Sequence, residues 1–326
     1  MGVKWYDSTD AGAPVLTGNA AGELLNLLTK CLVEGYGAKT ALGWEKLGPT
    51  GHKAAYRATA PGATGCWLHV NDAGPGAHGY REARARGYRE LASLDGSGDP
   101  VGATTPFPTT AQMASGSVWR RSHTADATAR RWSLYGDERF FQLWVEGGYG
   151  TNHFDGAWFG DLAEYGPVAV TGIAGRKTEG SASGPQQVNK TGNLVRTPGE
   201  VGTPGGMWAS ETAGQSIVTA NAGNFSYANT QTWAMGHTNG VPFPNNGDLR
   251  AYMGPVEWLS ADGFLGAVPG LYQPFHSRPL SHGALVEVIE GPLTGRTLRT
   301  QGFSAYDNTP ETDTGRVWID ITGPWR

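Results

Sequence analysis

Three acidic residues beside two aromatic ones come closest to a catalytic pattern in this chain. Asp155, Asp161 and Glu164 lie around Trp158 and Phe159. Glycoside hydrolases use two carboxyl groups that flank the scissile bond, so the segment admits a module that hydrolyses or binds a glycan. The alternative is the polar face of an ordinary β-sheet. We favour the sheet, because a chain with 29 acidic residues, 12 Trp, 12 Tyr and 10 Phe brings these types together by chance.

Histidines and cysteines offer a second kind of chemistry, metal binding. His276 and His282 are six positions apart in a proline-rich segment, with no third histidine or acidic partner close by in the sequence. A zinc centre needs three or four converging ligands, so we interpret both as ordinary polar or core histidines. Cys31 and Cys66 form neither a disulfide framework nor a zinc pattern. We interpret them as small buried apolar side chains.

The sequence motifs of the common catalytic folds are absent. There is no Walker loop, no dinucleotide-binding glycine fingerprint, no nucleophile elbow around a serine and no His-Glu-x-x-His motif. We therefore assign no catalytic, cofactor-binding or metal-binding residue. The chain is predicted not to be an enzyme and to need no cofactor.

Charge gives no sign of a nucleic-acid partner. The formal net charge is −4, and a nucleic-acid-binding domain usually carries a basic patch. The densest basic run contains Arg81, Arg84, Arg86 and Arg89. Residues 80–92 fit either a helix or an edge strand, and we favour the strand because Gly87 is central and charged residues alternate with alanines. The arginines are then expected on a solvated strand face.

Residues 19–34 are the clearest helix in the sequence. Leu24, Leu28 and Leu32 recur at helical spacing and form an apolar stripe. Asn19 is the expected N-cap, and Glu23 lies in the first turn, where a negative charge is favoured. The apolar stripe must pack on a sheet or on a partner.

The clearest hairpin follows in the middle of the chain. Arg130 to Leu134 forms one arm, residues 135–138 turn, and Arg139 to Val145 forms the other arm. Both alternating faces of the second arm carry bulky apolar side chains. Such a strand is buried on both sides or lies at an interface.

Composition predicts a mainly β protein. The chain has 326 residues with 50 Gly and 20 Pro, which suits many short strands joined by turns. We expect two β-sandwich or barrel-like lobes, residues 1–174 with the amphipathic helix and residues 207–326. Residues 175–206 are poor in large apolar residues and are expected to form a linker or an interface arm. Residues 241–282, rich in Pro and aromatics, are expected to be irregular coil.

Aromatic residues outside these elements are candidates for contacts between subunits. Residues 1–18 read as a polar, turn-rich arm that Trp5 and Tyr6 anchor to a neighbour. Tryptophan is enriched in the centres of interfaces. The further interface candidates are Trp208, Trp233, Trp258 and Trp325, with Trp318 beside them. The alternative for each ring is the core of its own chain, and the sequence does not separate the two.

Several segments resemble an uncharacterised family of tailed-bacteriophage virion proteins. They are Lys4-Trp5-Tyr6-Asp7-Ser8-Thr9-Asp10, Cys31-Leu32-Val33-Glu34-Gly35-Tyr36-Gly37, His52-Lys53-Ala54-Ala55-Tyr56-Arg57, Arg84-Ala85-Arg86-Gly87-Tyr88, Thr124-Ala125-Asp126-Ala127-Thr128-Ala129-Arg130 and Pro269-Gly270-Leu271-Tyr272. The resemblance is best before residue 165. It implies a structural place in the virion and carries over no catalytic residue.

From this resemblance we expect a structural component of the particle, assembled as a symmetric oligomer in the tail or baseplate region. A head-decoration or neck position is one alternative, and a glycan-binding or glycan-hydrolysing module is the other. The expected partners are copies of the chain and other virion proteins, without nucleic acid or membrane. The N-terminus lacks the apolar region of a signal peptide, so we expect synthesis in the bacterial cytoplasm and localisation in the virion.

Overall fold

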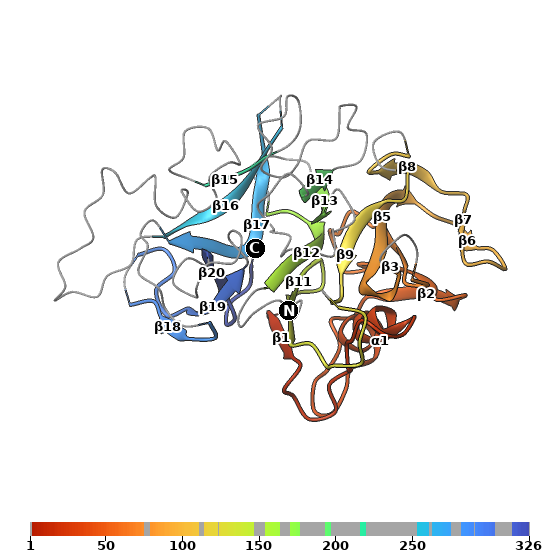
Figure 1. Ribbon diagram of the computed structural model, residues 1–326. Helices are drawn as coiled ribbons and strands as arrows, with labels where there is room; N and C mark the ends of the chain where they lie inside the picture. Colours follow the sequence, from red (N-terminus) through yellow and green to blue (C-terminus); the bar gives the residue numbers. More distant parts are fainter. Residues whose placement is uncertain are drawn as a thin grey trace.

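The computed structural model is mainly β, with antiparallel sheets and, among the residues it describes, a single short α-helix near the N-terminus (Figure 1). This confirms the predicted mainly β class. The structure describes residues 2–74, 79–110, 114–122, 124–146, 154–163, 170–176, 193–196, 216–219, 253–260, 263–274, 282–289, 291–303 and 315–325.

The larger sheet contains all strands from the first part of the chain except one small pair. Along it the strands follow the order β1-β10-β11-β12-β13-β9-β5-β4-β3-β2, with β14 paired to β13 and β8 to β5. Its strands are β1 Lys4–Asp7, β2 Glu45–Thr50, β3 Lys53–Arg57, β4 Trp67–Asn71, β5 Glu82–Glu90, β8 Thr104–Phe107, β9 Ser117–Arg120, β10 Trp132–Gly136, β11 Phe140–Glu146, β12 Phe154–Asp161, β13 Thr171–Arg176 and β14 Asn193–Arg196. The small pair is β6 Ser93–Leu94 and β7 Pro100–Val101, and a 3₁₀ turn, η2, spans Gly79–Arg81.

A second sheet comes from the C-terminal part of the chain, in the order β15-β16-β17-β20-β19-β18. Its strands are β15 Ser216–Thr219, β16 Met253–Ser260, β17 Gly263–Pro274, β18 Leu285–Glu287, β19 Thr297–Phe303 and β20 Gly315–Asp320. The prediction of irregular coil over 241–282 was wrong for the part that β16 and β17 occupy. Pro255 and Pro269 lie inside these strands, and register shifts interrupt the β16–β17 ladder, as expected where a proline cannot donate a ladder hydrogen bond.

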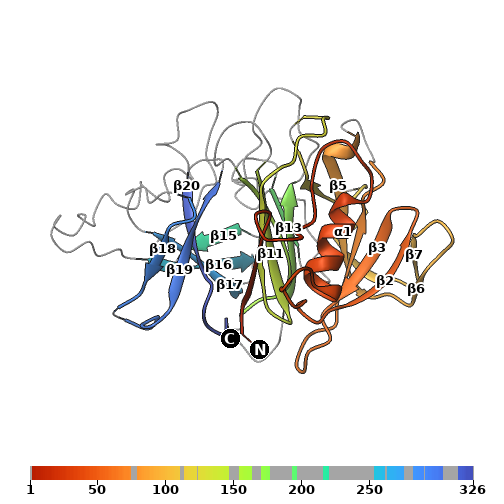
Figure 2. The same ribbon diagram turned by 90° about the horizontal axis from the view of Figure 1, so that it is seen from below.

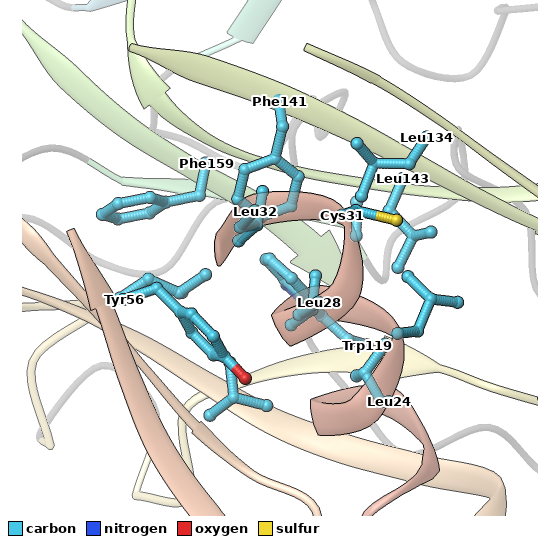
Figure 3. Close-up of a cluster of buried hydrophobic side chains, with 14 of the residues drawn as sticks. Leu24, Leu28, Cys31, Leu32, Tyr56, Trp119, Leu134, Phe141, Leu143 and Phe159 are labelled. Carbon is cyan, nitrogen blue, oxygen red and sulfur yellow. The ribbon is translucent and has the colours of Figure 1, made fainter. Parts of the chain in front are cut away.

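The predicted helix lies inside the larger sheet. It consists of α1, Glu23–Thr29, followed without a break by a π-helical turn, η1, Lys30–Glu34. Leu24, Leu28 and Leu32 are completely buried. Figure 3 shows them between Tyr56 of β3 on one side and Phe141 of β11 on the other. The apolar stripe therefore packs on the chain's own sheet, which curls around the helix, and not on a partner.

The start of the helix differs from the prediction. The N-cap is Gly22, in the left-handed region at φ 83°, and not Asn19. Gly22 has no side chain to cap the helix. Instead, the carboxylate of Asp72, directly after β4, accepts a hydrogen bond of 2.8 Å from the backbone N–H of Leu24. A residue distant in sequence thus supplies the cap that the local sequence lacks.

The predicted hairpin is confirmed as β10 and β11, which pair from Trp132–Val145 to Gly136–Phe141. Both of its faces are buried, as predicted. Leu134 and Leu143 face the helix core. Tyr135 and Trp144 belong to a second core, which also contains these residues of the C-terminal sheet and its flank: Val268, Leu271, Val317, Ile319 and Trp325. In Figure 2 the strands labelled β11 and β13 stand between α1 and the C-terminal sheet.

The N-terminal arm is a strand and not a free extension. β1 pairs antiparallel with β10, from Lys4–Gly136 to Asp7–Ser133. The turn-rich composition of residues 8–14 begins only after this strand ends.

The basic run is also placed differently from the prediction. Residues 82–90 form a strand, as favoured, but β5 lies inside the sheet between β4 and β9, with β8 beside its end. Arg84 is buried and not solvated, and its Nη1 lies 3.6 Å from Oε2 of Glu82 on the same strand.

The proposed domain boundaries at 174 and 207 stay predictions, since most of residues 177–215 lie outside the described part of the chain. The second core nevertheless contains side chains from both proposed lobes, for example Trp158 and Val317. The two sheets are therefore packed against each other through one continuous apolar interface.

Candidate functional site

Two of the three candidate carboxylates, those of Asp155 and Asp161, lie on one strand, β12, and are too far apart to act together. Asp155 and Asp161 are separated by six residues of extended chain, about 20 Å at the usual rise per residue. Paired glycosidase carboxylates are about 5–9.5 Å apart. These two residues therefore cannot flank a single glycosidic bond. Glu164, the third acid of the pattern, lies outside the described residues.

Asp161 holds strands and a loop together. Its side chain is 2% exposed. Oδ1 accepts hydrogen bonds from the hydroxyls of Thr64 at 2.6 Å and Thr171 at 2.7 Å. Oδ2 accepts from the backbone N–H of Thr64 at 2.9 Å and from Nε of Arg139 at 3.3 Å. Four donors on one buried carboxylate tie the 61–65 loop to β12 and β13, which is a structural role.

Asp155 belongs to a buried ionic network that crosses three strands. Its Oδ2 lies 3.3 Å from Nε of Arg120 on β9. Nη2 of Arg120 donates a 3.0 Å hydrogen bond to Oε1 of Glu82 on β5, and Nη1 of Arg84 lies 3.6 Å from Oε2 of the same glutamate. Glu82 and Arg84 expose 1% and 4% of their side chains. Two positive and two negative groups balance, which is what burial of charge requires.

The aromatic neighbours of these acids do not form a sugar platform. Trp158 points into the second core, where its ring lies 6.1 Å from that of Trp144. Phe159 points to the opposite face, into the helix core, and its ring lies 6.2 Å from Trp44. Both side chains are 1% exposed. Sugar stacking needs an accessible ring face, and neither residue has one.

The metal hypothesis receives no support from the part of the chain that the structure describes. In it, no group of three or more His, Cys, Asp or Glu side chains is placed to hold an ion. His282 stacks on Phe154 with ring centroids 4.5 Å apart, whereas His276 lies outside the described residues. Cys31 and Cys66 are free and buried, as predicted, and burial raises the pKa of both thiols. A raised thiol pKa disfavours the nucleophilic thiolate.

The aromatic interface candidates that can be placed lie in the chain's own core. Tyr6 is completely buried, and its hydroxyl donates to the carbonyl of Thr40 at 2.7 Å. Trp325 is 8% exposed and packs edge-on against Phe140. These rings are thus not free to anchor a neighbouring subunit. The same holds for Trp318, which is 2% exposed.

The remaining candidates are placed only in part. Trp258 lies on β16, opposite Ile217 of β15, but its side chain is outside what the structure describes. Trp208 and Trp233 lie outside the described residues. Trp5 is half-buried on β1, and its ring stacks on Tyr135 at 6.5 Å.

Arg299 of β19 is one of the polar residues that join the two sheets, beside Gln142 and Gln301, and sequence analysis did not single it out. Its Nη2 lies 3.2 Å from Oδ2 of Asp7, and its Nη1 donates to the hydroxyls of Ser133, at 3.2 Å, and Tyr135. The guanidinium carbon lies 4.5 Å from the ring centre of Trp5. Burial raises the pKa of Tyr135 to about 12, against the lowering effect of Arg299. Nothing in the local sequence of a basic strand residue indicates a partner near the N-terminus.

A second buried ion pair lies at the start of the helix. Asp72 and Arg121 both have fully buried side chains, and Oδ1 of Asp72 is 3.0 Å from Nη1 of Arg121. Nη1 also donates to the carbonyl of Ala20 at 2.6 Å. Burial raises the pKa of Asp72 to about 7, although Arg121 and the hydrogen bonds from Leu24 and Leu25 oppose the rise. This pair positions the start of the helix.

Asp155, Asp161 and Asp72 thus hold strands and the helix in place. In comparisons with known proteins, no family model and no curated protein matches this chain. Among the described helices, none is long and apolar enough to cross a membrane.

Proposed function

We propose that this chain is a non-catalytic structural component of a tailed-phage particle, assembled as a symmetric oligomer in the tail or baseplate region. The positions of the candidate acids support a non-catalytic role. Asp161 is saturated by four donors and Asp155 is paired with Arg120 inside the sheet. Neither is presented to a substrate.

The virion part of the proposal rests on the sequence segments that resemble phage virion proteins. The β-rich architecture agrees with it in kind, since particle proteins work by packing against neighbours. Long glycine-rich segments suit this role because they order against adjacent subunits.

Quantitative mass spectrometry of purified particles, separated into heads and tails, tests the proposal. We expect the chain in the tail fraction at a low, fixed ratio to the other tail proteins. Recovery with heads in hundreds of copies would make it a decoration protein and overturn the tail position. Absence from both fractions would overturn the structural role, and glycan binding would then be tested with immobilised host-surface glycans.

A further inference from the structure

The outer edge of the C-terminal sheet is apolar and exposed. β18 is the last strand of that sheet, and Figure 1 shows it at the lower left, to the left of β19. Leu285 is 60% exposed and Ile289, just beyond the strand, is 74% exposed. Glu287 between them is also exposed, while Val286 and Val288 are half-buried.

Leu285, Glu287 and Ile289 direct their backbone groups away from β19. Ala284 accepts a hydrogen bond from Thr300, and Val288 donates one to the carbonyl of Arg296, so the even-numbered residues face β19. In an antiparallel ladder the intervening residues direct their N–H and C=O groups to the other side. The backbone groups of these three residues therefore point away from β19, and Leu285 and Ile289 add exposed apolar side chains.

The strands at the two ends of the larger sheet, β2 and β1, are protected in ways that β18 is not. β2 contains Pro49, which cannot donate a hydrogen bond to an added strand. β1 is covered by the segment after the helix, where Lys39 Nζ donates 2.8 Å to the carbonyl of Trp5. Residues 284–289 contain no Pro, no Gly and one charge, which is the composition of a strand that pairs with other strands.

We propose that β18 pairs antiparallel with β18 of a second copy of this chain, across a two-fold axis at Val286. This inference deepens the proposed function, on which it rests, by naming the contact through which copies join. In this register Val286 lies opposite Val286, and Ala284 opposite Val288. Leu285 lies opposite Glu287, so the two Glu287 carboxylates are kept apart. An axis at Glu287 would instead oppose like charges, which is destabilising.

Cysteine cross-linking of the full-length chain tests both the contact and its register. Residues on a non-hydrogen-bonded antiparallel pair have Cα atoms about 4.5 Å apart, which a disulfide spans. V286C is therefore expected to form a disulfide-linked dimer under mild oxidation. E287C is the matched control, because the two positions are diagonal and about 7–8 Å apart, beyond disulfide reach. Cys31 and Cys66 are buried and give no background.

Two substitutions of opposite charge, made in the V286C variant, distinguish pairing in this register from general apolar association. L285E is placed opposite Glu287 of the other copy and is expected to lower cross-linking several-fold. L285K gains an opposite charge there and is expected to cross-link as well as V286C alone. Thermal unfolding is measured for each variant, since Arg299 lies opposite Leu285 in the ladder.

Equal cross-linking at 286 and 287, equal loss with L285E and L285K, or no cross-linking at all would overturn the β18 pairing. That failure is distinct from failure of the proposed function. A chain recovered from particles but not cross-linked at Val286 remains a virion protein that assembles through another surface.

Discussion

Arg299 Nη2 lies 3.2 Å from Oδ2 of Asp7, although 292 residues separate the two in the chain. The contact joins the strand at the edge of the larger sheet to the interior of the C-terminal sheet. Ser133 and Tyr135 add hydroxyl acceptors for the same guanidinium. The first and last parts of the chain are therefore held by a shared polar contact above a shared apolar core.

Removing Arg299 is expected to destabilise the whole protein and not only the C-terminal sheet. Arg299→Met leaves Asp7 without its positive partner and should lower the free energy of unfolding by about 2–4 kcal/mol. Urea denaturation measures this. In a double-mutant cycle with Asp7→Asn, the two changes should cost less together than their sum, since they remove one interaction. Strict additivity would contradict the direct coupling.

Two buried arginines share the carboxylate of Glu82, so its charge is expected to contribute strongly to the stability of the fold. Glu82→Gln leaves Arg84 and Arg120 with one carboxylate fewer inside the sheet and should cost about 3–5 kcal/mol of stability. The matched control is Glu34→Gln, in an exposed pair with Lys30, which should cost about 0.5 kcal/mol or less. Similar losses for both variants would mean that the network is not insulated from water.

Shortening one side chain in the core around the helix is expected to lower the stability of the protein strongly. Leu28→Ala removes a completely buried side chain between β3 and β11 and should cost about 2–5 kcal/mol. Val15→Ala is the control, because Val15 is 60% exposed and a surface change costs within about 0.5 kcal/mol. A small loss at Leu28 would argue against a helix enclosed by the sheet.

Asp72 gives a pH dependence whose sign follows from its pKa. Burial raises the pKa of Asp72 from 3.8 to about 7, so the folded chain binds a proton that the unfolded chain releases. The stability that this proton contributes is complete below pH 3.8 and is lost as the pH rises through 7. We expect the stability difference between the wild-type chain and Asp72→Asn to shift against the wild type over this range.

Chemical denaturation at a series of pH values measures that difference. His69 acts in the other direction, because burial lowers its pKa from 6.5 and stability is lost as the pH falls below that value. It is present in both proteins, so its contribution cancels in the comparison. A shift in favour of the wild type with rising pH would show that Arg121 keeps Asp72 charged throughout.

Features of the fold could be predicted from the sequence where the interactions that form them join residues close together in the chain. The β10–β11 hairpin was predictable, because alternating bulky residues on both faces require burial on both faces. The helix start was not, because its cap, Asp72, is 48 residues from Leu24. The burial of Arg84 was missed because its partner Glu82 belongs to a network that the local sequence does not show. Glu82 also pairs with Arg120 of β9, which in turn pairs with Asp155 of β12.

The aromatic residues show a second reason why parts of the structure could not be predicted from the sequence. Tyr6 and Trp325 were candidates for interfaces between copies, with the chain's own core as the alternative, and both are buried in that core. Large aromatic rings are favoured in both environments, so residue type alone cannot separate them. The apolar edge at β18 escaped the sequence analysis because Leu285 and Ile289 look like any other strand residues until the strand order places them at a margin.

The central claim is that the chain is a structural part of the phage particle. Interrupting its gene with a stop codon, and examining the lysate by electron microscopy and plaque counts, tests that claim most directly. The account predicts incomplete particles and loss of plaques, both restored when the full chain is supplied from a plasmid. Infectious particles of normal appearance and composition without the chain would contradict it.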